Sequence, residues 1–88
     1  MVTVLLSAGW AHRGQRRFVC PEGTVRDIIR EFVATYPAYR RRLLDSAGEP
    51  LTYYNVYLDG VLVENVDRAR MWVGSDSTVA IVPPLAGG

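Results

Sequence analysis

Lysine is absent from this sequence, and all ten basic side chains are arginines. A genome rich in G and C, which favours arginine codons, is the ordinary explanation of such a bias. The chemical consequence holds in either case. Without an ε-amino group on any lysine, copies of this chain cannot be joined to one another by isopeptide bonds to lysine.

Cysteine and histidine occur once each, as Cys20 and His12. A disulfide within the chain and an iron–sulfur cluster held by four thiolates are therefore excluded. A zinc site built from several such ligands is excluded as well. A Cys–His dyad would lack an evident third group to orient it, which makes nucleophilic catalysis a weak interpretation.

Long apolar runs are also missing, since none approaches the roughly 18 residues that a membrane span requires. The first residues do not show the charged and apolar regions of a signal peptide. We therefore expect a cytoplasmic protein without a membrane partner. The net charge of +1 argues against a nucleic-acid partner, because non-specific binding requires a strongly basic face.

The composition that remains is that of one globular domain. The chain has 88 residues, of which 49% are hydrophobic and 22% charged. A chain of this size buries a little over 60% of its unfolded surface, enough for one modest core.

The first half of the chain predicts two strands followed by a helix. Residues 2–6 and 16–20 are rich in β-branched and apolar side chains and read as a pair of strands. Thr24 and Asp27 then have the spacing of a helix N-cap close to a capping box. The following apolar residues recur with helical spacing and end at Pro37, and they are Val25, Ile28, Ile29, Phe32, Val33 and Tyr36.

The second half predicts a short helix and three strands. Residues 38–44 form the short helix with Leu43 and Leu44 inward, and Asp59-Gly60 is a type I′ turn between strands 55–58 and 61–63. Residues 66–73 are expected to be irregular or a single turn that covers one end of the core with Met71 or Trp72. A turn at 74–77 leads to strand 78–82. Its apolar run from Val79 predicts a central strand buried on both faces.

This order of elements predicts an α+β fold of the β-grasp (ubiquitin-like) type. A mixed sheet of about five strands would have one main helix packed across it. We expect residues 1–82 to form this domain and residues 83–88 to form an extended tail.

The tail is the most informative part of the sequence, and it reads Pro83-Pro84-Leu85-Ala86-Gly87-Gly88. Average composition gives a terminal Gly-Gly in roughly one chain in 200, and the preceding Pro-Pro makes chance less plausible still. Prolines cannot continue a sheet, and glycines form the thinnest possible peptide. Six residues in polyproline II geometry reach about 19 Å, enough to place the carboxylate of Gly88 in another protein's active site. A frayed terminus is the alternative interpretation.

Three segments of the chain resemble the ThiS/MoaD family of ubiquitin-like sulfur-carrier proteins. They are the hairpin 55–60, the turn and strand 74–82, and the tail 83–88. The family's Asp-Gly-Asp-x-Val turn is matched only loosely by Gly74, Asp76 and Val79, with an extra serine. Within the family, the stretch Arg42-Leu43-Leu44-Asp45 that leads to the Asn55 hairpin is most similar to carriers of the CysO type.

The resemblance implies a function for the tail. An E1-like adenylating enzyme of the MoeB/ThiF type would use ATP to adenylate the carboxylate of Gly88. A sulfur donor would then replace AMP, and the resulting thiocarboxylate would give its sulfur to a biosynthetic acceptor enzyme. The residues from Pro83 to Gly87 would thread into the partner, with Leu85 docked in a groove. The chain would bind no cofactor and no metal, and it would not itself be an enzyme. No catalytic side chain is evident in the sequence.

Several other residues have two interpretations. Cys20 is a small buried hydrophobe or a reactive thiol, and we favour the first. The run Arg40-Arg41-Arg42 is a solvated helix face, which we favour, or a contact for an acidic partner. Trp10 and His12, in a loop between glycines, either fold onto the core or anchor an interface, and Tyr53 and Tyr54 share that ambiguity.

Three classes of function stay open. We favour the sulfur carrier. A ubiquitin-like modifier, conjugated to substrate lysines through the same C-terminus, begins with the same acyl-adenylate. A β-grasp binding module with an inert tail would bind its partner unchanged after the tail is removed.

Overall fold

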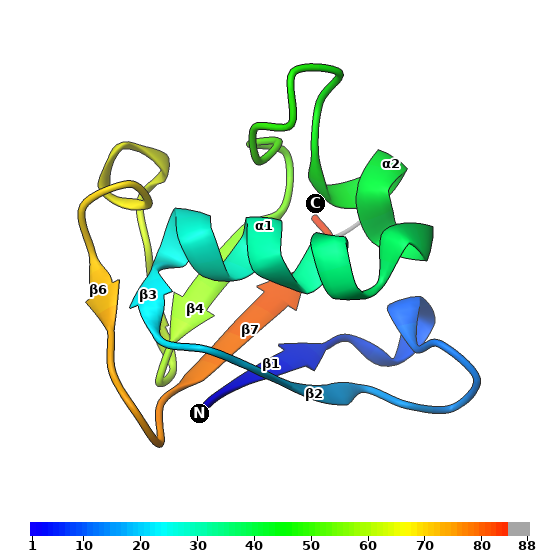
Figure 1. Cartoon of the computed structure of the whole chain (residues 1–88), viewed down its shortest axis with the longest axis horizontal. Coiled ribbons are helices and arrows are strands. Elements are labelled where there is room, and N and C mark those ends of the chain that lie inside the picture. The colour runs from blue at the N-terminus through cyan, green and yellow to red at the C-terminus, as the bar shows by residue number, and fades with distance from the viewer. Residues whose placement is uncertain (85–88) are drawn as a thin grey trace.

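The computed structural model describes residues 1–84, and their centre is a mixed sheet with helices on one face (Figure 1). The order in the five-stranded sheet is β2-β1-β7-β4-β5. The strands are β1 (Val2–Leu6), β2 (Arg17–Cys20), β4 (Asn55–Leu58), β5 (Val61–Leu62) and β7 (Thr78–Val82). The β-grasp arrangement expected from the sequence is confirmed.

Strand β7 lies in the middle of this sheet. It runs parallel to β1, with Leu6 opposite Ile81, and antiparallel to β4, with Asn55 opposite Val82. The predicted central position is therefore confirmed. Burial on both faces is not, because Val79 and Ile81 are fully buried whereas Ala80 and Val82, on the other face, are only half-buried.

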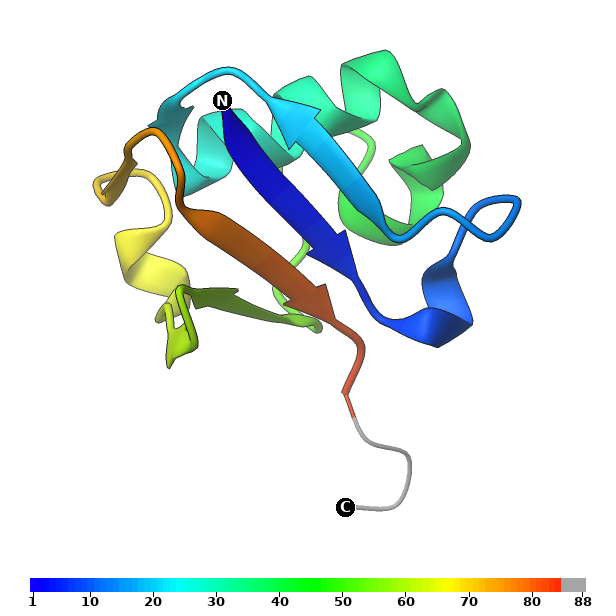
Figure 2. The ribbon, with the colours of Figure 1, turned by 90° about the horizontal axis from the view of Figure 1, so that it is seen from below.

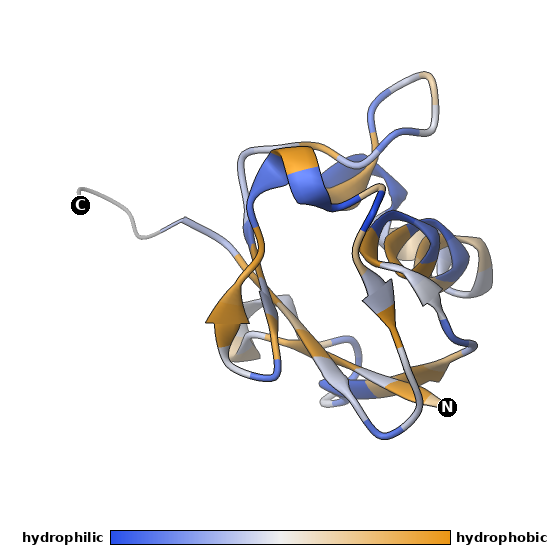
Figure 3. Cartoon of the chain, turned by 90° about the vertical axis from the view of Figure 1, so that its left-hand side faces the viewer, coloured by the Kyte–Doolittle hydropathy of each residue, from blue (hydrophilic) through white to orange (hydrophobic). Residues whose placement is uncertain are grey.

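Helix α1 (Val25–Thr35) covers one face of the sheet (Figure 1). It begins with the capping box that the sequence predicts: Thr24 Oγ1 accepts the N–H of Asp27 at 3.1 Å, and Asp27 Oδ2 accepts the N–H of Thr24 at 3.2 Å. The predicted apolar face is buried against the sheet from Val25 to Val33. Figure 3 colours each residue by its hydropathy, and hydrophobic and hydrophilic residues alternate along α1.

The segment between α1 and β4 is fixed by a buried arginine. It begins with a 3₁₀ turn (Pro37–Tyr39) and α2 (Arg40–Leu43). Leu43, at the end of α2, and Leu44 after it are buried in the core, as predicted. Arg68 is only 5% exposed, and its guanidinium donates to the carbonyls of Leu51 at 2.8 Å and Tyr54 at 2.9 Å. These two bonds hold the loop that leads into β4.

Residues 66–73 differ from the prediction. After a 3₁₀ turn (Asn65–Asp67), β6 (Trp72–Val73) pairs antiparallel with β3 (Gly23–Thr24) in a separate two-stranded sheet. Met71 packs against the core, as one of the two predicted alternatives requires, whereas the Trp72 side chain is 64% exposed.

The predicted hairpin turn is present, with positive φ at both central residues, 48° at Asp59 and 87° at Gly60. Within residues 1–84, no helix has the length and apolar character needed to cross a membrane.

Candidate functional site

The candidate site is the point where the chain leaves the end of β7 (Figure 2). Val82 is the last residue to pair with β4; Pro83 after it is half-buried and Pro84 is exposed. Neither proline has an N–H to continue the ladder, which explains why the strand ends here. Leu85, Ala86, Gly87 and Gly88, the rest of the predicted tail, lie outside the described residues. The structure therefore describes the surroundings from which the tail departs.

Three segments lie at the end of the fold where the chain leaves β7, and we call them the exit rim: residues 7–17, 36–44 and 50–55. The first follows β1, which runs parallel to β7, and the third leads into β4, which pairs with β7 at Val82. The second is joined to both. Tyr39 Oη donates to the Trp10 carbonyl at 2.6 Å, and Tyr53 Oη donates to the Arg42 carbonyl at 2.9 Å. The rim is thus one connected surface.

Aromatic side chains form the centre of the exit rim. The ring of Trp10 lies 6.4 Å from the rings of both Tyr53 and Tyr54. Tyr54 is buried and Trp10 is half-buried against the core. Of the two predicted alternatives, these two side chains therefore follow the one in which they pack onto the core. Tyr53 is 48% exposed, and His12, 6.1 Å from the Tyr39 ring, is also exposed.

The sheet face opposite α1 is a second feature near the exit. The strand register places Arg17, Leu5, Ala80, Tyr57 and Leu62 in one row across all five strands. Leu62 is 46% exposed, and Leu5, Ala80 and Tyr57 are half-buried. In the described part of the chain no helix covers this face (Figure 2). We did not predict this open face from the sequence, although the half-polar alternation of residues 2–6 is a signal for it.

Cys20 is part of the core. Its side chain is 2% exposed, and burial, with a smaller effect of the nearby Glu31 carboxylate, raises the pKa of the thiol to about 11. The thiol is therefore protonated at neutral pH, which agrees with the structural interpretation. Residues 1–84 contain no cluster of three or more side chains suited to hold a metal ion.

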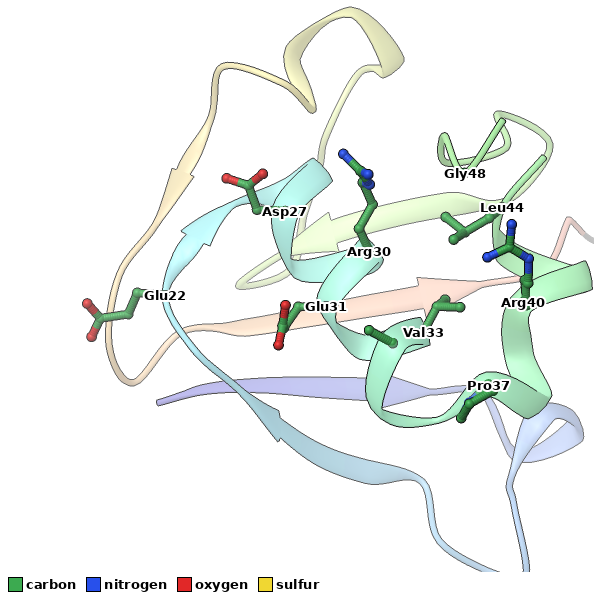
Figure 4. Close-up of a pocket in the computed structure, with 10 residues that line it drawn as sticks. Glu22, Asp27, Arg30, Glu31, Val33, Pro37, Arg40, Leu44 and Gly48 are labelled. Atoms are coloured by element: carbon green, nitrogen blue, oxygen red, sulfur yellow. The ribbon is translucent and has the colours of Figure 1, made fainter. Parts of the chain in front are cut away.

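A groove of about 690 Å³ lies on the helical side of the molecule, between α1 and the segment that contains α2. Glu22, Asp27 and Glu31 line one part of it, and Arg30 and Arg40 another. Figure 4 shows these charged side chains pointing in different directions, without a common centre. Since polar groups in a ligand site converge, we do not regard this groove as the functional site.

Comparison with known proteins finds similarity both in sequence and in structure. No family model matches the chain. It is 31% identical, over 67 residues that make up 76% of this chain and 72% of the relative, to small archaeal modifier protein 3 of Haloferax volcanii.

Among solved structures, SAMP1 of Haloferax volcanii has a TM-score of 0.76 at 25% identity, and the match covers 99% of this chain and 98% of SAMP1. The Amycolatopsis orientalis BexX/CysO complex gives a TM-score of 0.81 at 23% identity, covering 100% of both chains. At that identity the second match supports the fold alone.

Proposed function

This chain belongs to the ThiS/MoaD family of ubiquitin-like carrier and modifier proteins, and we propose that it carries sulfur as a thiocarboxylate on Gly88. The observation that supports this most is the placement of the tail. It follows the central strand of the sheet, the strand held on both sides by β1 and β4, and it begins with two prolines. A rigid base and a thin end suit a segment that must enter another protein's active site.

The proposed chemistry requires no side chain of this protein. The carboxylate of Gly88, ionised at neutral pH, attacks the α-phosphorus of ATP in a MoeB/ThiF-type adenylating enzyme, and pyrophosphate leaves. A hydrosulfide equivalent from a sulfur donor then attacks the acyl carbon, and AMP leaves. The thiocarboxylate is afterwards the nucleophile that delivers sulfur in the acceptor enzyme. ATP is thus a substrate of the partner enzyme.

A protein modifier is the second candidate, and the name of the Haloferax volcanii relative favours it. Both functions start from the acyl-adenylate. They diverge at the nucleophile, which is sulfide for a carrier and the lysine of another protein for a modifier. The intact mass of the product distinguishes them, because a carrier exchanges one oxygen for sulfur whereas a modifier forms conjugates of higher mass.

Removal of Gly88 tests what the two candidates share. The truncated protein should give no ATP–pyrophosphate exchange with its adenylating enzyme, because the reacting carboxylate is displaced by one residue. Its melting temperature should equal that of the parent, since Ile81 is the last core residue within residues 1–84. Exchange at the parental rate would exclude activation at Gly88.

A further inference from the structure

The charged side chains divide unequally between the exit rim and the rest of the molecule. The rim contains no aspartate or glutamate and six of the ten arginines, namely Arg13, Arg16, Arg17, Arg40, Arg41 and Arg42. All nine acidic residues and the other four arginines lie elsewhere. The side-chain charge is therefore +6 on the rim and 4 − 9 = −5 on the remainder, which together give the net +1. Although the whole chain is nearly neutral, positive charge is thus concentrated on the rim from which the tail departs.

The positive charge of the rim is not neutralised within the described residues. The ion pairs among residues 1–84 involve Arg26, Arg30 and Arg70, none of which belongs to the rim. The acidic residue nearest in sequence, Asp45, accepts the N–H groups of Ala47 and Glu49 through Oδ1. Arg40, Arg41 and Arg42 are exposed on a four-residue helix, and charges this close repel one another.

The rim also presents the residue types that contribute most to protein interfaces. The guanidinium of Arg42 lies 5.8 Å from the centre of the Trp10 ring, and Tyr53 beside it is half-exposed. Arg16 is fixed as well, because its Nε donates to the Leu6 carbonyl at 3.0 Å. Side chains held in this way lose little entropy on binding.

We propose that the exit rim docks on an acidic protein surface that surrounds the tail entrance of the adenylating enzyme. This inference rests on the proposed function, since it assumes that the tail enters that enzyme. Cationic residues placed around the tail bring the rim and an acidic entrance together in the orientation that admits the tail. They also increase the rate of encounter at low salt.

An acidic protein fits these observations better than a nucleic acid does. A bound polyanion would occupy the exit of the tail, and the net charge of −5 on the remainder of the molecule would repel a long one. An acidic patch of limited size on a protein meets neither obstacle.

The test compares two double variants that each remove two positive charges. Arg40→Gln/Arg41→Gln changes the rim. Arg30→Gln/Arg70→Gln changes two exposed arginines outside it, with exposed side-chain fractions of 46% and 74%. Binding to the MoeB/ThiF-type enzyme of the same organism, and ATP–pyrophosphate exchange, are measured at about 50 mM and about 300 mM NaCl, where screening differs strongly.

We expect the rim variant to raise KM for the carrier, and Kd for the complex, by about tenfold or more at the lower salt concentration. Its kcat should stay within about twofold of the parent, because the reacting carboxylate is unchanged. The parent's affinity should fall with salt, and that of the rim variant should fall less. The control variant should behave like the parent, and both variants should keep the parental melting temperature.

If the two variants changed KM and Kd equally, or if the rim variant changed neither, the inference would be overturned. Exchange by the parent would still support the proposed function in that case. Salt-sensitive binding that the rim variant weakens, without any exchange by the parent, would support the rim and refute the proposed function. Tight binding of a single-stranded RNA oligonucleotide to the parent at physiological salt, lost in the rim variant, would overturn the inference in favour of a nucleic acid.

Discussion

At the scale of single residues, Gly87 is the position where an added side chain should matter most. We expect Gly87→Val to reduce ATP–pyrophosphate exchange by about 10²-fold or more, because a small misplacement at the reacting centre has an effect of that size. The melting temperature should not change.

Gly74→Val is the matched control for this substitution. Nothing lies within 4 Å of a Cβ built at Gly74, and the turn that contains it is at the far end of β7 from the tail. Exchange by the Gly87 variant at the rate of this control would contradict the threading of the tail.

Cys20 leads to a prediction about alkaline pH. The thiol ionises near pH 9 in the unfolded chain, but its pKa is about 11 in the folded protein. Up to pH 9 both states hold the proton; above it, only the folded state does. The free energy of unfolding should therefore fall with rising pH through the window from 9 to 11, by about 1 kcal/mol between pH 9 and 10.

Urea unfolding at pH 8, 9 and 10 measures this slope, and Cys20→Ala is the comparison. Burial also raises the pKa of Tyr54, to about 12, and that of Tyr39, and these two groups contribute mainly above pH 10. The comparison with the alanine variant isolates the contribution of Cys20. An unchanged slope in the alanine variant would show that the thiol is not the group responsible.

Local chemistry explains which single residues could be predicted from the sequence. The Thr24–Asp27 capping box and the Asp59-Gly60 turn depend on residues within a few positions of each other, so their patterns are sufficient. Arg68 is different, because its burial depends on two carbonyls more than ten positions away in the chain. No local pattern signals such a partner.

At the scale of elements, helix α1 and its aromatic contacts determine the core. Phe32 is fully buried, with its ring 5.0 Å from that of Phe18 and 5.3 Å from that of Tyr36. Phe32→Ala should lower the free energy of unfolding by about 3–5 kcal/mol, since it removes a buried aromatic and leaves a cavity.

Chemical denaturation measures this loss. Phe32→Leu, which keeps more of the volume, should cost less than the alanine variant and remain folded for comparison. Glu31→Ala, on the exposed side of the same helix, should stay within about 0.5 kcal/mol of the parent. A loss at Phe32 no larger than that at Glu31 would mean that the helix does not pack as described.

Periodicity explains which elements could be predicted. Helix α1 and strands β1, β4 and β7 have enough residues to show their patterns. Strands β3 and β6 have two residues each and are defined only by pairing with each other across most of the chain. In β7, four consecutive apolar residues concealed the fact that one face of the strand is open.

At the scale of the whole molecule, the exposed side chains of the exit rim lie at one end of the fold, although Tyr39, Leu43, Leu44 and Tyr54 of the same segments belong to the core. Helix α1 and the sheet bury their side chains between them, whereas the exit rim and the tail are at one end of β7. The sequence could predict the tail because it is contiguous. It could not predict the rim. The pairing of β7 with β1 and β4 brings residues 7–17 and 50–55 together. The hydrogen bonds of Tyr39 and Tyr53 join residues 36–44 to them.

The tail does not distinguish a carrier from a modifier, because both functions use it. The product that the whole protein forms does. With the adenylating enzyme, ATP and a sulfide source, we expect one product, in which Gly88 has exchanged oxygen for sulfur. Buried Cys20 should react slowly with a thiol-selective alkylating reagent, whereas the thiocarboxylate should react rapidly. The label should therefore appear at the C-terminus, and a Cys20→Ser variant should take it up to the same extent. If that variant takes up no label, and the protein is found in cells joined to lysines of other proteins, the chain is a modifier.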